Sequence, residues 1–150
     1  MKGQPRTAGL EVVGRIRDAI NEHDLAALVD VFDPDVVSEA PAHPQRTFRG
    51  ADQVRRNWEQ IFAVIPDLHA DLLDAVVHGD TVWSEWDWSG TRRDGSAHQM
   101  RGVTILRLKD SRATSVHFYM EPVDEDGPGP SEAVRRIIGG AAATGKADLR

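Results

Sequence analysis

The chain has 150 residues, 40% of them hydrophobic, which is typical of one ordinary globular domain. It contains no cysteine, which excludes disulfide bonds, thiolate metal sites and a cysteine nucleophile. Its 24 acidic and 18 basic residues give a formal net charge of −6, which disfavours binding to nucleic acids or to anionic membranes. No apolar stretch is long enough to span a bilayer and the N-terminus lacks the apolar segment of a signal peptide, so we expect a cytoplasmic protein.

Two amphipathic helices are predicted near the N-terminus, after a flexible segment at residues 1–9. The apolar residues of the first helix recur at helical spacing and are Leu10, Val13, Ile16 and Ile20. Asp24 is a suitable N-cap for the second helix. The apolar side of the second helix consists of Leu25, Leu28, Val29 and Phe32. The sequence Asp33-Pro34-Asp35 is expected to end it.

A short strand at residues 36–40, a loop at 41–49 and a third helix are expected next. Gly50 precedes this helix and Pro66 ends it. Its apolar side is the clearest in the chain and consists of Val54, Trp58, Ile61, Phe62 and Ile65.

From residue 67 onward the apolar residues change from a helical period to the two-residue period of a strand. Four strands are predicted, at about residues 68–78, 81–91, 97–109 and 113–121. The connections contain the turn sequences Gly79-Asp80, Asp94-Gly95 and Asp110-Ser111. Short connections join antiparallel neighbours, so the last three strands are expected to form a meander.

The two faces of this sheet differ in polarity. Even positions are mostly apolar and include Val82, Trp86, Trp88, Met100, Leu106, Leu108, Val116, Phe118 and Met120. Odd positions carry the charged residues, among them Glu85, Asp87, Arg101, Arg107, His117 and Glu121. Trp83, Val103, Ile105 and Tyr119 interrupt the charged side. We therefore expect this outer face to contact a second copy of the chain in a homodimer.

These elements predict an α+β fold in which three N-terminal helices pack on a strongly curved antiparallel sheet. The domain is expected to span residues 10–123. Residues 124–150 are interpreted as a Gly/Pro linker, a short helix at 131–138 and a mobile tail.

Short motifs occur in a distinctive order along residues 10–123. They are Asn21 to Asp24, Leu25, Phe32, Gly50, Pro66-Asp67, Gly79-Asp80, Trp86, Gly90-Thr91, Arg101-Gly102-Val103 and Tyr119-Met120-Glu121-Pro122. In this order and spacing the chain resembles the SnoaL-like, polyketide cyclase-like group of the nuclear transport factor 2-like superfamily. The resemblance implies a cone-shaped, cystatin-like α+β barrel with a deep hydrophobic pocket, usually dimeric and usually without a metal or organic cofactor. It does not imply one reaction.

The ketosteroid isomerases of that superfamily use a tyrosine and two acidic residues. In the register that the resemblance implies, the oxyanion tyrosine falls on Ile16, the general base on Ala40 and the proton-donating aspartate on Thr104. All three functional groups are missing, so this isomerase mechanism is excluded for the chain.

The predicted ligand pocket combines aromatic, aliphatic and small polar side chains. Its predicted lining is Ile16, Ala40, Trp58, Phe62, Ser84, Trp86, Trp88, Met100, Thr104, Phe118 and Met120. Either the aromatic rings line a cavity for a flat apolar ligand, or they fill a closed core. The hydroxyl groups either bind a ligand carbonyl or satisfy nearby backbone groups.

Four residues are candidates for acid–base chemistry. His43 belongs to the loop expected near the pocket mouth, where it is either a general acid or base or a solvent-exposed side chain. Asp87, Arg101 and His117 are expected on one face of neighbouring strands. They either activate a water molecule or form a cross-strand ion pair on the face away from the pocket. No histidines and carboxylates occur at metal-ligand spacing, so no metal site is predicted.

Two functions follow from this reading. The first is binding of a small, largely apolar molecule of the polyketide or terpenoid type, with cofactor-free cyclisation, isomerisation, dehydration or hydration. The second is a ligand-binding or dimerisation module without catalysis. An ionisable group within reach of the cavity favours the first, and a cavity without one favours the second.

Overall fold

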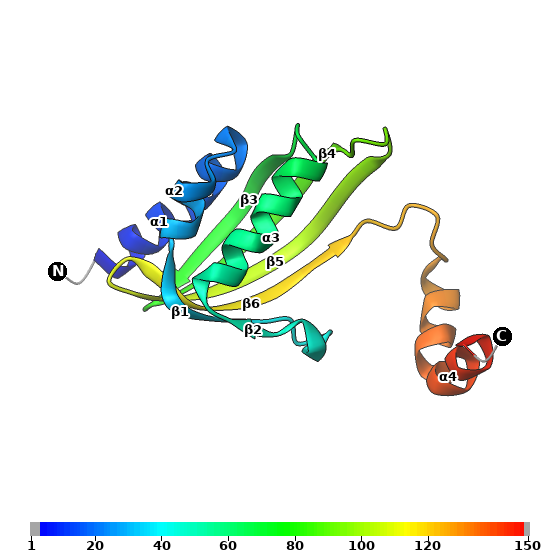
Figure 1. Ribbon diagram of the computed structural model, residues 1–150. Helices are drawn as coiled ribbons and strands as arrows, with labels where there is room; N and C mark the ends of the chain where they lie inside the picture. The colour runs from blue at the N-terminus through cyan, green and yellow to red at the C-terminus, as the bar shows by residue number, and fades with distance from the viewer. Residues whose placement is uncertain (1–3, 149–150) are drawn as a thin grey trace.

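The computed structural model describes the backbone of residues 4–148 and the side chains of residues 7–140. The elements are α1 (Gln4–Glu22), α2 (Leu25–Asp30), β1 (Phe32–Glu39), the 3-10 helix η1 (Pro44–Arg46), β2 (Phe48–Arg49), α3 (Ala51–Val64), β3 (His69–His78), β4 (Thr81–Thr91), β5 (Ala97–Lys109), β6 (Arg112–Pro122) and α4 (Pro130–Asp148). The strands form one six-stranded sheet in the order β2-β1-β6-β5-β4-β3. Helices α1 to α3 cover one face of this curved sheet, and α4 extends away from it (Figure 1).

The predicted α+β class is confirmed, with two corrections to the sheet. It stays open rather than closing into a barrel, because β2 and β3 are its edges. It is also mixed rather than antiparallel, since β1 pairs parallel with β6. A parallel pair needs a long crossover, which α3 and the four strands between β1 and β6 supply.

The alternation predicted along the meander is confirmed. Trp86, Leu106 and Met120 are almost fully buried beneath the helices. On the opposite, outer face, Trp83 is 51% exposed and Tyr119 41%. The apolar side chains of even positions and of α1 to α3 therefore form one core.

The segment after α2 differs from its prediction. Phe32 was expected on the apolar side of the second helix but begins β1 instead. Val31, which is fully buried, ends α2, and its carbonyl accepts a hydrogen bond from the Ala113 N–H at 2.9 Å. Pro34 lies where the pairing of β1 with β6 shifts register, a position that needs no ladder hydrogen bond from its nitrogen.

The turn between α1 and α2 attaches the helices to the edge of the sheet. Asn21 pairs with the backbone of Ala70 through two hydrogen bonds, of 2.7 and 3.0 Å. The His23 ring lies 3.0 Å from the Leu68 carbonyl oxygen and stacks on Phe62. These contacts fix α1 and α2 above β3, and so set one wall of the space under the helices.

The terminal segments also differ in extent from the sequence-based boundaries. Helix α1 begins at Gln4, within the segment expected to be flexible, and α4 (Pro130–Asp148) consists of two helical pieces joined across a kink. Gly140, with φ of 53°, forms this kink, two residues beyond the predicted end of the short helix at residue 138. Residues 1–3 and 149–150, which belong to the segments predicted to be flexible or mobile, lie outside the described residues.

Candidate functional site

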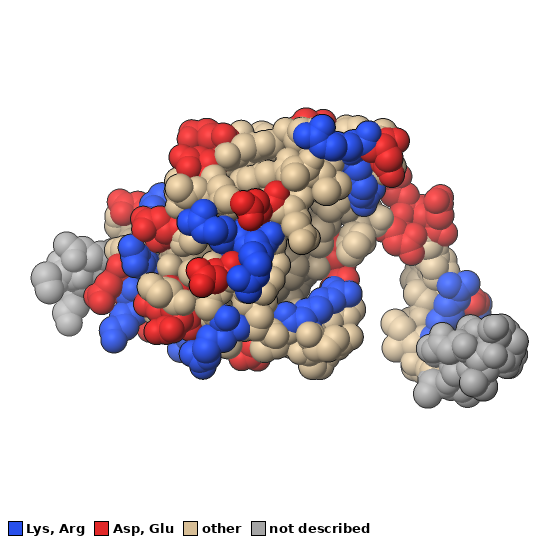
Figure 2. All heavy atoms as spheres, viewed as in Figure 1, with Lys and Arg blue, Asp and Glu red and all other residues tan. Residues whose placement is uncertain are grey.

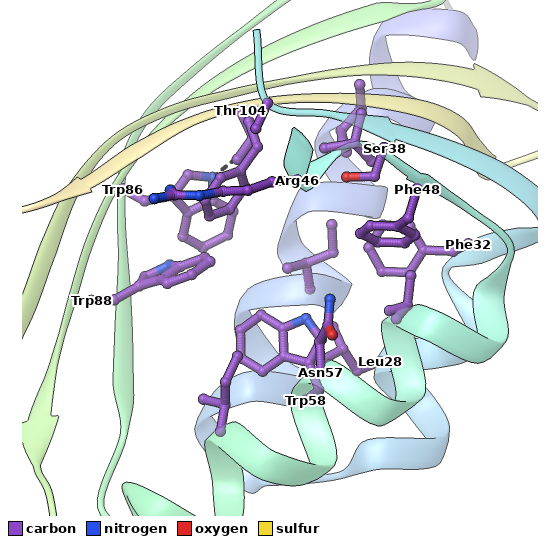
Figure 3. Close-up of a pocket in the computed structure, with 17 residues that line it drawn as sticks. Leu28, Phe32, Ser38, Arg46, Phe48, Asn57, Trp58, Trp86, Trp88 and Thr104 are labelled. Atoms are coloured by element: carbon purple, nitrogen blue, oxygen red, sulfur yellow. Dashed lines mark hydrogen bonds between the residues drawn. The ribbon is translucent and has the colours of Figure 1, made fainter. Parts of the chain in front are cut away.

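A cavity of about 260 Å³ lies between helices α1 to α3 and the concave face of the sheet. Seven of the predicted pocket residues line it, namely Ile16, Ala40, Trp58, Trp86, Trp88, Thr104 and Phe118. The other lining residues are Leu28, Phe32, Ser38, Arg46, Phe48, Val54, Asn57, Ile61, Leu106 and Val116. Figure 3 shows Trp58 rising from α3 toward Trp86 and Trp88 on the sheet.

Aromatic rings form one wall of the cavity. Trp88 is at its centre, with ring centroids 5.4 Å from Trp58, 6.2 Å from Trp86 and 6.0 Å from Phe118. The interplanar angles are 65°, 66° and 51°, so the rings meet edge to face or tilted. Rings in such contacts leave parts of their faces free for an apolar ligand.

A buried group of polar atoms orients Trp86. Its indole N–H donates to the hydroxyl of Ser84 at 2.9 Å and to that of Thr104 at 3.2 Å. The two hydroxyl oxygens are 2.9 Å apart and bond to each other. Ser84 therefore serves this network rather than the cavity, which it does not line.

Three other predicted pocket residues do not line the cavity. Phe62 lies on α3 but faces the turn between α1 and α2, where it stacks on His23. Met100 and Met120 pack in the core of the sheet, and Met120 is only 1% exposed. The spacing of apolar residues along a helix or strand identifies its buried side. It does not show which residues of that side enclose a cavity and which fill the core.

The three positions that the isomerase resemblance singled out come together at the cavity. Ile16 of α1, Ala40 after β1 and Thr104 of β5 all line it. The Thr104 hydroxyl is already bonded to Ser84 and Trp86. None of the three side chains is a general acid or base.

Asp87, Arg101 and His117 lie on the outer face of the sheet and do not line the cavity. Asp87 and Arg101 are cross-strand partners, as predicted, with an Arg101 Nη2 to Asp87 Oδ2 distance of 2.8 Å. The Asp87 carboxylate also accepts a hydrogen bond from Gln99 at 3.1 Å. His117 is not part of this pair: its nearest acidic partner is Glu39, at 3.9 Å. This arrangement is a surface ion pair.

His43 precedes η1, beside the cavity, without lining it. Its Nε2 lies 3.0 Å from Oε2 of Glu121, at the end of β6. His98, at the start of β5, also lies outside the lining. Partial burial and the nearby Arg92 guanidinium lower the pKa of the His98 imidazole below its ordinary value of 6.5.

Arg46 and Asn57 are the polar lining residues that the sequence did not indicate. Arg46 belongs to a loop with no apolar period, and Asn57 is one residue before Trp58 on a helix whose polar positions otherwise face solvent. The only available signal was that Asn57 immediately precedes the predicted aromatic wall.

No group of three or more histidine, aspartate or glutamate side chains in the described part of the chain is arranged to hold a metal ion. None of the helices in the described residues combines the length and apolar character needed to cross a membrane. Acidic and basic side chains are interspersed over the visible face of the body (Figure 2).

The chain belongs to the SnoaL-like family, because the family model described as a SnoaL-like domain matches residues 13–116. Its structure is similar to a ketosteroid isomerase-like protein of Catenulispora acidiphila, solved in complex with trimethylamine, with 25% identity, a TM-score of 0.61 and coverage of 73% of this chain and 85% of that one.

Two further solved structures share the fold. IdmH of Streptomyces antibioticus, described as a candidate polyketide cyclase, is 24% identical, with a TM-score of 0.66 over 79% of this chain and 92% of that one. An LEH-like epoxide hydrolase of M. tuberculosis is 15% identical, with a TM-score of 0.66 over 77% of this chain and 84% of that one. Comparison with curated protein sequences gives no match.

Proposed function

We propose that this protein binds a small, largely apolar molecule of the polyketide or terpenoid type in the cavity beneath α1 to α3. The observation that carries the proposal is the wall formed by Trp58, Trp86, Trp88 and Phe118 around a cavity of about 260 Å³. Ligand pockets usually enclose roughly 300–1,000 Å³. A volume just below that range favours a ligand of one or two rings over a larger polycyclic molecule.

Binding without catalysis is the form of this proposal that the lining supports best. No aspartate, glutamate, histidine, lysine or tyrosine is among the residues that line the cavity. General acid–base catalysis needs such a group within hydrogen-bond reach of the ligand, directly or through one water molecule. The similarity to IdmH and to an epoxide hydrolase concerns the fold and does not supply the missing group.

The relative from Catenulispora acidiphila was solved in complex with trimethylamine, whose protonated form is a cation of the kind that tryptophan faces attract. In this protein, however, the lining includes the guanidinium of Arg46. A positive charge at the cavity disfavours a cationic ligand. We therefore propose a ligand without a positive charge.

Replacing Trp58 with leucine is expected to weaken binding of a neutral two-ring probe, 2-naphthamide, about fivefold, because the aromatic contact contributes about 1 kcal/mol. Titration calorimetry gives the dissociation constants. Val64→Ala is the control, since Val64 is an exposed apolar residue on the same helix, α3, outside the cavity lining. Equal weakening by both substitutions, or no binding to the wild-type protein, would contradict the proposal.

We also propose that the outer face of the sheet pairs two copies of the chain. Its exposed apolar residues include Val76, Trp83 and Tyr119, and Val76 and Trp83 are direct cross-strand partners. Contiguous apolar surface of this kind on a sheet is typical of an interface.

Replacing Trp83 with arginine is expected to weaken such a dimer at least about thirtyfold, since loss of a central tryptophan typically costs about 2 kcal/mol or more. Light scattering after size exclusion should give twice the 16.5 kDa chain mass for the wild type and a single chain for the variant. Val134→Arg, on an exposed position of α4, is the control and should remain dimeric. A wild-type protein that is monomeric at high concentration would refute the dimer.

A further inference from the structure

The polar groups of the cavity are mainly hydrogen-bond donors. Arg46 contributes a permanent positive charge, and its side chain makes no hydrogen bond or ion pair with the side chains and backbone that the structure describes. In Figure 3 this side chain extends from η1 across the cavity rather than away from it. No carboxylate is among the lining residues. The guanidinium therefore lacks a negative partner inside the protein.

Asn57 presents a second donor, because neighbouring residues on α3 fix its orientation. Arg56 donates to Oε1 of Gln53 at 2.7 Å, so the amide nitrogen of Gln53 is free to donate. That nitrogen bonds Oδ1 of Asn57 at 2.8 Å. The Nδ2 group of Asn57 then remains as a donor, and Figure 3 shows it directed toward the cavity.

Trp88 adds a third donor without an acceptor. The side chain is 6% exposed, and its Nε1 is a buried polar atom with no hydrogen-bond partner among the described residues. Trp86, its neighbour on the same strand, donates to two hydroxyl groups. A buried N–H without an acceptor is unfavourable, and an oxygen atom of a ligand would relieve this.

We propose that the ligand of this cavity is an amphipathic carboxylic acid, whose carboxylate binds Arg46 while its rings contact Trp58, Trp86 and Trp88, with Asn57 as a further donor on the α3 side. This rests on the proposed function and adds to it the chemical class of the ligand. The planar guanidinium binds a carboxylate through two parallel N–H···O bonds. One guanidinium balances the single negative charge of a carboxylate, whereas it would leave one charge of a doubly charged phosphate unpaired.

The test compares two probes of the same shape, 2-naphthoate and 2-naphthamide, which differ in charge and in acceptor oxygens. We expect wild-type protein to bind 2-naphthoate at least tenfold more tightly than 2-naphthamide in titration calorimetry. Arg46→Gln should abolish this preference by weakening 2-naphthoate about tenfold, with 2-naphthamide little changed. Arg49→Gln is the matched control, because Arg49 is an exposed arginine on β2 outside the lining, and it should keep the preference.

The outcomes separate this proposal from the one on which it rests. Equal affinity of the two probes for the wild type, or an unchanged preference in Arg46→Gln, would overturn carboxylate recognition while leaving apolar binding in place. If Arg49→Gln lost the preference to the same extent, general surface charge rather than a site at Arg46 would explain the tighter binding of 2-naphthoate. This result would also overturn carboxylate recognition at Arg46. Binding of neither probe would contradict both proposals.

Discussion

Replacing Gly102 with alanine is expected to lower the free energy of unfolding by about 2–6 kcal/mol. Gly102 lies in the middle of β5, opposite Met120 of β6, with φ of 153°. A side chain in this glycine-favouring region costs about 1–3 kcal/mol. A Cβ atom there would also lie 2.8 Å from the Met120 Cα and closer still to the Tyr119 carbonyl oxygen. Because these are backbone atoms of a paired strand, relieving the overlap requires the sheet to shift, for a further 1–3 kcal/mol or so.

The control for this prediction is Gly95→Ala. Gly95 also has a positive φ, of 90°, but no atom lies within 4 Å of the position its Cβ would take. Its substitution should therefore cost only the backbone contribution, about 1–3 kcal/mol. Urea denaturation of the three proteins gives the comparison. If Gly102→Ala were no more destabilising than Gly95→Ala, the close approach of β5 and β6 would not be a constraint on the fold.

The parts of the fold that the sequence predicted are those in which apolar residues recur at a regular spacing along a helix or strand. Alternation along β4 to β6 places every second side chain on one face, so Trp86 and Leu106 could be assigned to the core before any coordinates existed. The turn at Asp110-Ser111 was predicted from two polar residues between two strands. In the structure both residues adopt the positive φ that such two-residue turns need.

The parts that were not predicted depend on contacts between distant residues. The parallel pairing of β1 with β6 joins Phe32 to Ala113, and nothing near Phe32 in the sequence indicates that partner. Arg46 is similar. It belongs to a proline-containing loop, which has no repeating pattern of apolar residues from which the position of a side chain could be predicted. Only the path of the chain from β1 through η1 to β2 carries it over the cavity.

The sequence predicted most of the aromatic lining of the candidate site, but not its polar groups. The residues expected to form the aromatic wall line the cavity, except Phe62. Phe62 instead stacks on His23, in the turn between α1 and α2. The catalytic candidate Asp87 lies on the outer face because β4 pairs with β5 without a shift of register. His117 lies there because β6 keeps its even positions on the buried side after the register shift between residues 113 and 115. A further bulge before either residue would have turned it inward.

Replacing Trp86 with alanine is expected to lower the free energy of unfolding by about 3–5 kcal/mol, because the ring is 1% exposed and its loss leaves a cavity in the core. Trp86→Phe separates the ring from its hydrogen bonds. Phenylalanine keeps most of the apolar volume but cannot donate to Ser84 and Thr104, whose hydroxyls still bond each other at 2.9 Å. The two hydroxyls are therefore not left unsatisfied, and we expect this variant to lose only about 1 kcal/mol.

Urea denaturation of Trp86→Ala and Trp86→Phe beside the wild type tests which contribution is larger. A large difference between the variants would mean that burial of the aromatic ring stabilises this part of the core, with the N–H bonds mainly setting the orientation of the indole. Similar losses in the two variants would mean the reverse, that the buried network with Ser84 and Thr104 dominates. The cavity wall would then depend on hydrogen bonds more than on packing, and any substitution of Thr104 should disrupt it to a comparable extent.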